Sequence, residues 1–339
     1  MTSATVLAAD VGRTTCRVAR YEDGTRTRAT ATSCGWSLAD AEGVQGVGSA
    51  LVRCVEQLVE PAEEVAAISI GATGAAQDRS AARGLVDWLQ RRLHGIEVLV
   101  ASDVVTAHAG ALAGGPGTVT VAGTGAVALA VGAHGAWHLV DGSGWLLGDA
   151  GGGVQIGRAG LAAALRYHDG RPGGSRWMAE AAHRRYGPPE HLPEVVHGDA
   201  QPARLLAGFV PDVADAARAG DPVAAAVFAE AVDDLAATTV TACRALPDAG
   251  AVVAFAGGLF DLDDLVTAPL RAAVTHMLPR AEVREPVGDA IEGARRLLVD
   301  GVGSYRQLVL HAPAIPREAR RAASGVVSAA PSSNRREEA

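Results

Sequence analysis

The chain has 339 residues, of which 48% are hydrophobic and only 4% aromatic, and this length and composition favour two domains of the α/β class. The net charge of −8 argues against nucleic acid or an anionic membrane surface as a partner. Because the sequence shows no bilayer-length apolar run and no charged-then-apolar leader, we expect a cytoplasmic protein that binds small molecules.

The basic residues are unusual, because the chain contains no lysine and all 30 of them are arginine. This excludes a Walker-A phosphate loop and Schiff-base catalysis, which both require a lysine amine. Any bound phosphate must therefore be held by backbone N–H groups and hydroxyls. The four cysteines show no CxxC spacing, so we interpret them as reduced thiols rather than ligands of a cluster within one chain: Cys16, Cys34, Cys54 and Cys243.

The N-terminal part predicts a three-stranded meander. An apolar strand over residues 4–10 ends in Asp10, a tight turn follows through Gly12 and Thr14, and two more strands complete the meander by residue 33. Glycine lets a backbone N–H approach an anion closely and threonine adds a hydroxyl donor. The turn therefore suits a phosphate.

Helices and buried strands alternate after this meander. Helices are predicted at 43–59 and 81–93, and strands at 65–70 and 96–101. The second strand runs into Ser102-Asp103 and a helix over 104–113. Asp103 is thus predicted at the carboxyl end of a strand, where open α/β sheets place their ligands.

The pattern repeats after a hinge candidate at residues 114–117. Two strands within residues 119–131 flank the turn Gly123-Thr124-Gly125, and a third strand leads toward Gly144 and Asp149. Two meanders, each with a Gly/Thr turn, indicate a duplicated domain. Further elements follow in order: a helix at 153–167, short helices within 168–202, and helices at 203–219 and 222–246, the last with Asp221 as N-cap.

The C-terminal part contains one more buried strand, at 252–256, which ends in Gly257-Gly258. A helix at 261–277, a short strand at 281–284 and a last helix at 290–308 are predicted next. From His311 onward the sequence has no periodicity, which predicts a disordered tail. We place the domains at 1–115 and 116–310 and the tail at 311–339, and expect the last helix to pack back on the N-terminal domain.

Together, the glycine turns that follow strands indicate a cleft between two similar domains that holds a nucleotide. Asp10 would orient a hydrated magnesium ion, which prefers oxygen ligands and retains waters. Three groups would contact ATP: Gly12 and Thr14, Gly123 to Gly125, and Gly257 with Gly258. Asp103 would accept the proton of a hydroxyl that attacks the γ-phosphoryl group, while Asp149 would bind neighbouring hydroxyls. The alternative for both aspartates is a helix cap alone.

The motifs Asp10-x-Gly12-x-Thr14, Ser102-Asp103, 122–126, 144–149 and 256–260 resemble, in this order, the BadF/BadG/BcrA/BcrD-type ATPase family, and within it the N-acetylglucosamine kinases. The resemblance covers residues 4–308. It implies a two-domain actin-like ATPase fold (ribonuclease H-like), each domain a mixed sheet flanked by helices, with ATP and Mg2+ in the interdomain cleft. It also implies phosphorylation of an amino sugar at its 6-hydroxyl, with Asp103 as base and Asp149 as sugar ligand. We add Gly144 and Trp36 to the sugar site and expect a homodimer.

Three positions depart from the family pattern on the sugar side. Cys34 stands where the family has asparagine, Ala150 where it has glutamate, and Ser143 where it has tryptophan. N-acetylglucosamine is therefore the first choice of acceptor, with glucosamine and N-acetylmuramate as alternatives. Two other classes of function are an ATPase that activates a redox partner, which the dispersed cysteines oppose, and a non-catalytic sugar sensor, which the retained Asp10, Asp103 and Thr124 oppose.

Overall fold

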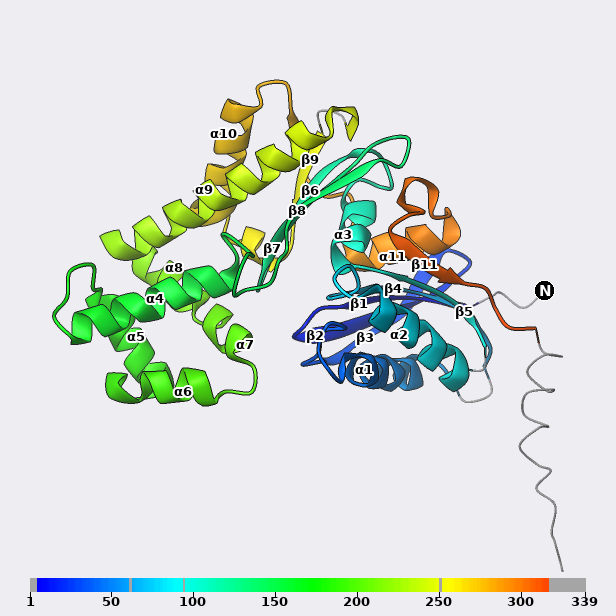
Figure 1. Ribbon diagram of the computed structural model, residues 1–339, viewed down its shortest axis with the longest axis horizontal. Coiled ribbons are helices and arrows are strands. Elements are labelled where there is room, and N and C mark those ends of the chain that lie inside the picture. The colour runs from blue at the N-terminus through cyan, green and yellow to red at the C-terminus, as the bar shows by residue number, and fades with distance from the viewer. Residues whose placement is uncertain (1–4, 61–62, 94, 250–251, 317–339) are drawn as a thin grey trace, which may run out of the picture.

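The computed structural model describes residues 5–60, 63–93, 95–249 and 252–316, which fold into two lobes that each contain one mixed sheet (Figure 1). Within these ranges, the sheet of the first lobe has the strand order β11-β5-β4-β1-β2-β3 and that of the second lobe β10-β9-β6-β7-β8. The first sheet comprises β1 (Thr5–Val11), β2 (Thr15–Glu22), β3 (Thr25–Ser33), β4 (Val65–Ala72), β5 (Glu97–Ala101) and β11 (Val309–Ala312). The second comprises β6 (Gly117–Ala122), β7 (Ala126–Val131), β8 (Trp137–Asp141), β9 (Val252–Ala256) and β10 (Glu282–Arg284).

The two sheets share one plan, as the repeated turn pattern predicts. In each, an antiparallel meander (β1-β2-β3 or β6-β7-β8) has its first strand paired in parallel with a later one, β4 or β9. The register aligns Asp10 of β1 with Gly71 of β4, and Gly71 with Ala101 of β5. The carboxyl ends of these three strands therefore lie side by side.

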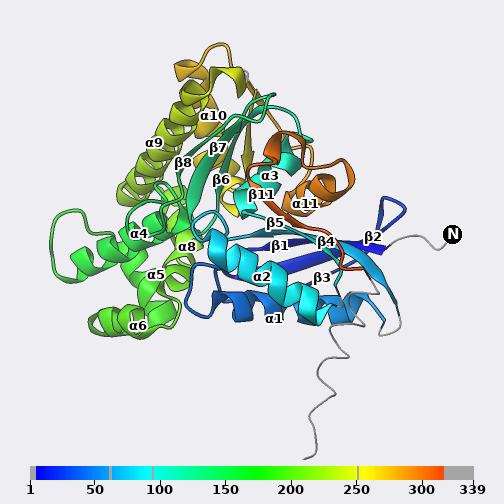
Figure 2. The same cartoon turned by 45° about the vertical axis from the view of Figure 1, so that its right-hand side comes forward.

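Helices α1 (Gly43–Leu58) and α2 (Arg79–Arg92) cover one face of the first sheet (Figure 2). On α1 the buried residues Val47, Leu51, Val55 and Leu58 recur every three or four positions, which places them on one side of the helix. Burying one such leucine fully contributes about 1.5–3 kcal/mol. This apolar stripe fixes α1 against the strands that carry the first turn.

The opposite face of the first sheet carries α3 (Asp103–Ala111) and α11 (Ala290–Val299). The two helices touch backbone to backbone, because a Cβ at Gly293 would overlap the carbonyl oxygen of Thr106, and one at Gly110 would overlap that of Asp289. The buried His108 of α3 makes two polar contacts in this layer. Its Nε2 lies 2.9 Å from the carbonyl oxygen of Gly117 and its Nδ1 lies 2.8 Å from the hydroxyl of Tyr305.

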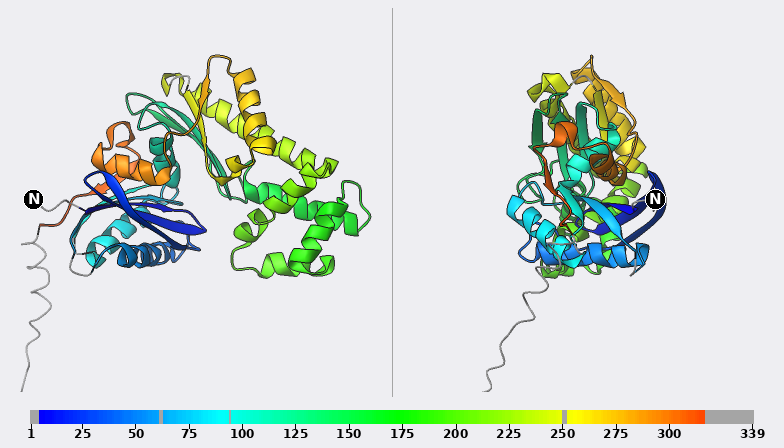
Figure 3. Two further views of the ribbon diagram at one scale, coloured as in Figure 1. Left: turned by 180° about the vertical axis from the view of Figure 1, so that it is seen from behind. Right: turned by 90° about the vertical axis from the view of Figure 1, so that its right-hand side faces the viewer.

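The second lobe extends away from its sheet as a group of helices (Figure 3). These are α4 (Gly153–His168), α5 (Arg176–Tyr186), α6 (Leu192–Gly198), α7 (Pro202–Ala207), α8 (Val210–Arg218), α9 (Pro222–Ala245) and α10 (Ala268–Met277). Asp221 caps α9 as predicted, since its carboxylate accepts hydrogen bonds from the backbone of Val223 and Ala224, both at 2.9 Å. Among the residues placed by the structure, no helix combines the length and apolar character needed to span a membrane.

Two predicted helices are wrong in extent. The helix predicted at 203–219 is interrupted between α7 and α8, because Pro211 in the first turn of α8 has no N–H to continue a helix. The helix predicted at 290–308 ends at Val299, and Gly301 with φ +85° turns the chain. The chain then forms β11, so His311 and Ala312 belong to a strand, not to the predicted tail. Residues 317–339 of that tail lie outside the described residues.

The packing of α11 involves the first lobe. Its residues Ile291 and Ala294 share a buried cluster with Ala8 of β1 and with Ala19 and Tyr21 of β2. The domain boundaries after residues 115 and 310 stay predictions.

Candidate active site

Polar residues gather where β1, β4 and β5 end. Thr73 follows β4, and its Oγ1 donates a hydrogen bond to Asp103 Oδ2 at 2.6 Å. The backbone N–H of Thr73 donates to the carbonyl oxygen of Val11 at 2.9 Å. The parallel register thus joins the ends of all three strands and holds the Asp103 carboxylate in one orientation.

Asp103 is the first residue of α3, and the N-cap is Ser102, which makes no side-chain cap bond. The helix-cap alternative for Asp103 therefore does not apply. Burial raises the pKa of the Asp103 carboxyl, the hydrogen bond from Thr73 lowers it, and the nearby charge of Asp10 raises it again. The side chain keeps some solvent exposure. A partly accessible carboxylate with a raised pKa is a stronger proton acceptor than an ordinary aspartate.

Asp10 lies on β1 opposite Arg17 of β2. Its carboxylate accepts hydrogen bonds from Arg17 Nη2 at 2.6 Å and from Nε at 3.2 Å. Burial raises the pKa of Asp10, and the Arg17 charge opposes this shift. Arg17 favours the ionised form of Asp10, and this ion pair lies beside the turn that contains Gly12 and Thr14.

The turn at Gly123-Thr124-Gly125 joins β6 to β7 and meets the start of α4. The carbonyl oxygens of Gly123 and Thr124 accept hydrogen bonds from the N–H groups of Gly153 and Val154, at 2.8 and 3.0 Å. A Cβ on Gly123 would have no atom within 4 Å, so its other side faces open space. The turn is anchored on one side and accessible on the other.

Gly257 lies beside the same turn, because β9 pairs in parallel with β6. Its φ is +111°, and a Cβ there would overlap the carbonyl oxygen of Ala122. Glycine is required at this position for both reasons. The structure therefore brings Gly257-Gly258 and the Gly123 turn together at the carboxyl ends of β6 and β9.

Asp149 lies in a loop that Asp141 organises. The Asp141 carboxylate accepts hydrogen bonds from the N–H groups of Asp149 and Ala150, both at 2.8 Å. Asp149 has a left-handed backbone (φ 59°), and the N-cap of α4 is Gly152, so Asp149 is not its helix cap. A Cβ on Gly125 would lie 2.5 Å from Asp149 Oδ2. The Asp149 carboxylate therefore lies directly against the Gly123-Thr124-Gly125 turn.

The pKa of Asp149 depends on charges from both lobes. Burial raises the pKa of its carboxyl, repulsion from Asp141 raises it further, and the charge of Asp103 adds a smaller rise. Backbone N–H groups of Ala126 and Gly144 act in the opposite direction. The charge of Asp103 in the first lobe thus adds to the rise in the pKa of Asp149 in the second.

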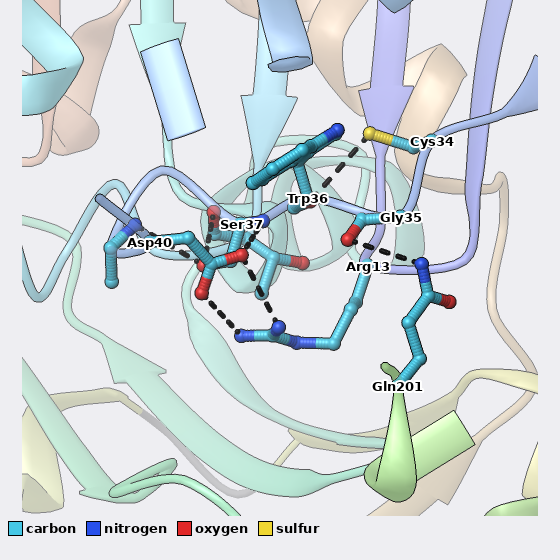
Figure 4. Close-up of polar contacts among 9 residues, drawn as sticks. Arg13, Cys34, Gly35, Trp36, Ser37, Asp40 and Gln201 are labelled. Atoms are coloured by element: carbon cyan, nitrogen blue, oxygen red, sulfur yellow. Dashed lines mark hydrogen bonds and ion pairs between the residues drawn. The ribbon is translucent and has the colours of Figure 1, made fainter. Parts of the chain in front are cut away.

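Trp36 belongs to the first lobe. It follows β3, and its ring packs so tightly over α1 that a Cβ on Gly46 would overlap it. The side chain is 36% exposed. Within the described ranges, no hydrogen bond or ion pair joins Trp36 to Asp103, Asp149 or Gly144. Figure 4 shows its surroundings, where Arg13 Nη1 and Nη2 contact both oxygens of Asp40 at 3.3 and 3.2 Å.

Sequence reasoning missed Thr73, Arg17 and Asp141. Thr73 stands in Gly71-Ala72-Thr73-Gly74, a strand-end glycine and threonine pattern of the kind used for the other turns. Asp141 stands in an Asp-Gly pair after a strand, which is a turn signal. Arg17 needed the strand register, because only pairing opposite Asp10 gives it a role.

Comparisons with solved structures find proteins of the same fold that are described as sugar kinases, some of them provisionally. A protein provisionally assigned as an N-acetylglucosamine kinase from Chromobacterium violaceum matches with a TM-score of 0.72 and 26% identity, over 87% of this chain and 99% of that one. A similarly assigned protein from Porphyromonas gingivalis matches with a TM-score of 0.65 and 19% identity, over 87% and 98%. A ROK family glucokinase from Streptomyces griseus, in complex with glucose and AMPPNP, matches with a TM-score of 0.57 and 21% identity, over 87% and 99%.

These likenesses confirm the predicted α/β, actin-like fold with two mixed sheets flanked by helices. A search of curated proteins found no match to the chain. A comparison with protein families, in contrast, matches residues 9–295, a range that holds the turns and carboxylates described above. Because this match spans most of the sequence, the protein belongs to the BadF/BadG/BcrA/BcrD ATPase family.

Proposed function

We propose that this protein is an ATP-dependent sugar kinase that transfers the γ-phosphoryl group to the 6-hydroxyl of an amino sugar. The observation that carries the proposal is the pair of carboxylates from the two lobes. Asp103 is oriented by Thr73 at 2.6 Å, and Asp149 lies against the Gly123-Thr124-Gly125 turn of the other lobe. The likeness to a provisionally assigned N-acetylglucosamine kinase supports the same class of acceptor.

The chemistry assigned to Asp103 is general base catalysis. Its carboxylate accepts the proton of the acceptor hydroxyl as that oxygen attacks the γ-phosphorus. A new O–P bond forms, the bond between the γ-phosphorus and the β,γ-bridging oxygen breaks, and ADP leaves with that electron pair. Asp149 accepts hydrogen bonds from neighbouring hydroxyls of the sugar and so orients it.

The residues on the first and second lobes fit ATP. The chain has no lysine to hold a phosphate. Three turns supply instead the backbone donors, the hydroxyls and the close approach that phosphates need: Gly12 with Thr14, Gly123 to Gly125, and Gly257-Gly258. The open space beside Gly123 is where a side chain would obstruct a phosphate. We assign these turns to the nucleotide.

Magnesium fits the donor set around Asp10. In the described ranges, no three His, Cys, Asp or Glu side chains form a group that could hold a metal. Magnesium bound with a nucleotide takes one or two carboxylates, phosphate oxygens and waters, and Asp10 would supply its Oδ1, because Arg17 bonds to Oδ2. When bound, the ion would neutralise charge on the phosphates.

The acceptor is proposed as N-acetylglucosamine, with glucosamine and N-acetylmuramate as alternatives. Ala150 uses only its backbone N–H, which donates to Asp141, so its side chain offers no polar contact where the family has glutamate. Cys34 offers a weak thiol donor that points to the carbonyl oxygen of Trp36 at 3.6 Å. The expected homodimer and cytoplasmic location stay predictions.

A coupled assay of ADP release tests the proposal. Purified protein with magnesium and ATP is screened against N-acetylglucosamine, glucosamine, N-acetylmuramate and neutral hexoses. We expect ADP release that depends on one amino sugar, with the 6-phosphate as the product by mass spectrometry. The absence of ADP release with every sugar, or ADP release that no sugar stimulates, would reject the kinase assignment.

A further inference from the structure

Gln201 brings the second lobe into contact with the first. It is the N-cap residue of α7, and its Nε2 donates to the carbonyl oxygen of Gly35 at 3.5 Å, across 166 positions of sequence (Figure 4). Gly35 has a φ of +85°, and a Cβ there would lie 2.6 Å from Gln201 Nε2. Glycine at position 35 is therefore what allows the amide to approach.

The segment that Gln201 meets is bonded to the proposed phosphate turn. The N–H of Gly35 donates to the carbonyl oxygen of Arg13 at 2.8 Å, and that of Cys34 donates to Thr14 at 3.1 Å. Asp40 holds the same segment by accepting from the N–H of Ser37 at 2.7 Å. Gln201 thus contacts a fixed part of the first lobe, between the turn assigned to ATP and the Trp36 assigned to the sugar.

The other half of the Gln201 amide is unsatisfied. Its Oε1 is buried and has no hydrogen-bond partner in the part of the chain that the structure describes. The amide cannot simply be reversed, because Gly35 presents a carbonyl oxygen and only the nitrogen can donate to it. In Figure 4 the oxygen points away from Gly35. A buried acceptor without a donor is costly, so a bound group that donates a hydrogen bond would be favoured there.

The chemistry of the Gln201 oxygen favours a neutral or cationic donor. Arg13 is occupied by both oxygens of Asp40. An unpartnered carbonyl oxygen attracts a hydroxyl, an amide N–H or an ammonium group and repels a carboxylate.

We infer, on the basis of the proposed function, that Gln201 is a specificity-determining residue: its Nε2 fixes the helical part of the second lobe to Gly35, and its Oε1 accepts a hydrogen bond from a hydroxyl or nitrogen donor of the sugar. The chain offers a matched control. Gln77 Nε2 also donates to a glycine carbonyl across the lobes, Gly142 at 3.0 Å, but Gln77 is an exposed residue.

The experiment compares Gln201→Leu, Gln201→Glu and Gln77→Leu with the wild type. The acceptor found in the screen and a set of its deoxy and deamino analogues, each lacking one donor, are used as substrates. We expect the wild type to reject one analogue by about tenfold or more in kcat/KM, because the analogue leaves Oε1 unpaired. Gln201→Leu loses this discrimination, and Gln77→Leu retains it. Gln201→Glu also loses it, because its carboxylate has no N–H to donate to the Gly35 carbonyl oxygen and is repelled from it. The KM for ATP stays unchanged in all three.

The outcomes separate the inference from the proposed function. Full discrimination in Gln201→Leu, or equal loss in Gln77→Leu, overturns the role of Gln201 while leaving the kinase assignment intact. If a sugar binds by calorimetry without being phosphorylated, the proposed function fails and the same analogue series, read as binding, still decides the inference. If no sugar binds, both fail. Thermal unfolding of each variant verifies the fold, and Gln201→Glu keeps the test decisive if the leucine variant unfolds.

Discussion

The hydroxyl of Thr73 donates to the carboxylate of Asp103 at 2.6 Å, so the residue after β4 orients the first residue of α3. A hydrogen bond to an ionised carboxylate is about twice as strong as one between neutral groups. The bond also lowers the pKa of Asp103 and so opposes the rise that burial causes. Orientation and proton affinity of the proposed base therefore depend on the same contact.

Replacing the proposed base is the most direct prediction. Asp103→Asn keeps the shape of the side chain, but the amide cannot accept a proton, so we expect kcat to fall by about 10²–10⁴-fold. Circular dichroism should show an unchanged fold, and calorimetry should show unchanged ATP binding. Near-normal turnover in this variant would remove Asp103 from the role of base.

Removing the Thr73 hydroxyl should change the pH dependence of the reaction. Thr73→Val keeps the volume and deletes the bond that lowers the Asp103 pKa, so that pKa rises. The base must be deprotonated to work, and the acidic limb of the kcat/KM profile should therefore move to higher pH. Thr73→Ser retains a hydroxyl and should restore the original profile. An acidic limb that is the same in all three proteins would show that Asp103 does not govern it.

Two glycines of one turn should give different kinetic effects. Gly123→Ala meets no protein atom within 4 Å, so the free energy of unfolding should change little while the KM for ATP rises, because the methyl group fills the space left for phosphate. Gly125→Ala places a methyl group 2.5 Å from Asp149 Oδ2, so the carboxylate must move and the acceptor KM should rise instead. We expect each change to be about tenfold, similar to the loss of one good hydrogen bond. The same kinetic parameter rising in both variants would contradict the assignment of the two sides of the turn.

His108 should make stability depend on pH. Burial lowers the pKa of His108 to about 4, and its Nε2 must carry the proton because Gly117 offers a carbonyl oxygen. In the unfolded chain the histidine pKa is about 6.5. Between about pH 4 and about pH 6.5, the unfolded chain therefore binds a proton at this histidine and the folded chain does not. The contribution of neutral His108 to the free energy of unfolding is therefore fully present above about pH 6.5. It is lost as the pH falls toward 4, and the total loss is on the order of 3 kcal/mol.

Urea unfolding at neutral and acidic pH measures this effect. We expect the wild type to lose about 2 kcal/mol more than His108→Gln between about pH 7 and about pH 5, because glutamine cannot take up the proton. Equal losses in the two proteins would show that His108 is not the group responsible.

The sequence predicted well what depends on local pattern. The two meanders, the strand ends and Asp103 at the start of a helix follow from apolar periodicity and from glycine after a strand. The contact between Thr73 and Asp103 could not be predicted, because it depends on how β4 and β5 align. The approach of Gln201 to Gly35 depends on how the helices of one lobe fold back toward the other, and no local signal in either segment specifies it.

The backbone contact between α3 and α11 has a consequence for substitution. Val104 and Val105 of α3 share a buried cluster with Leu129 of β7, so α3 also packs against the second sheet. At Gly110 and Gly293 the backbones of these two helices meet with no side chain between them. A methyl group at either position would have to push the two helices apart, because the atoms opposite it are backbone carbonyl oxygens, which cannot turn aside as a flexible side chain can.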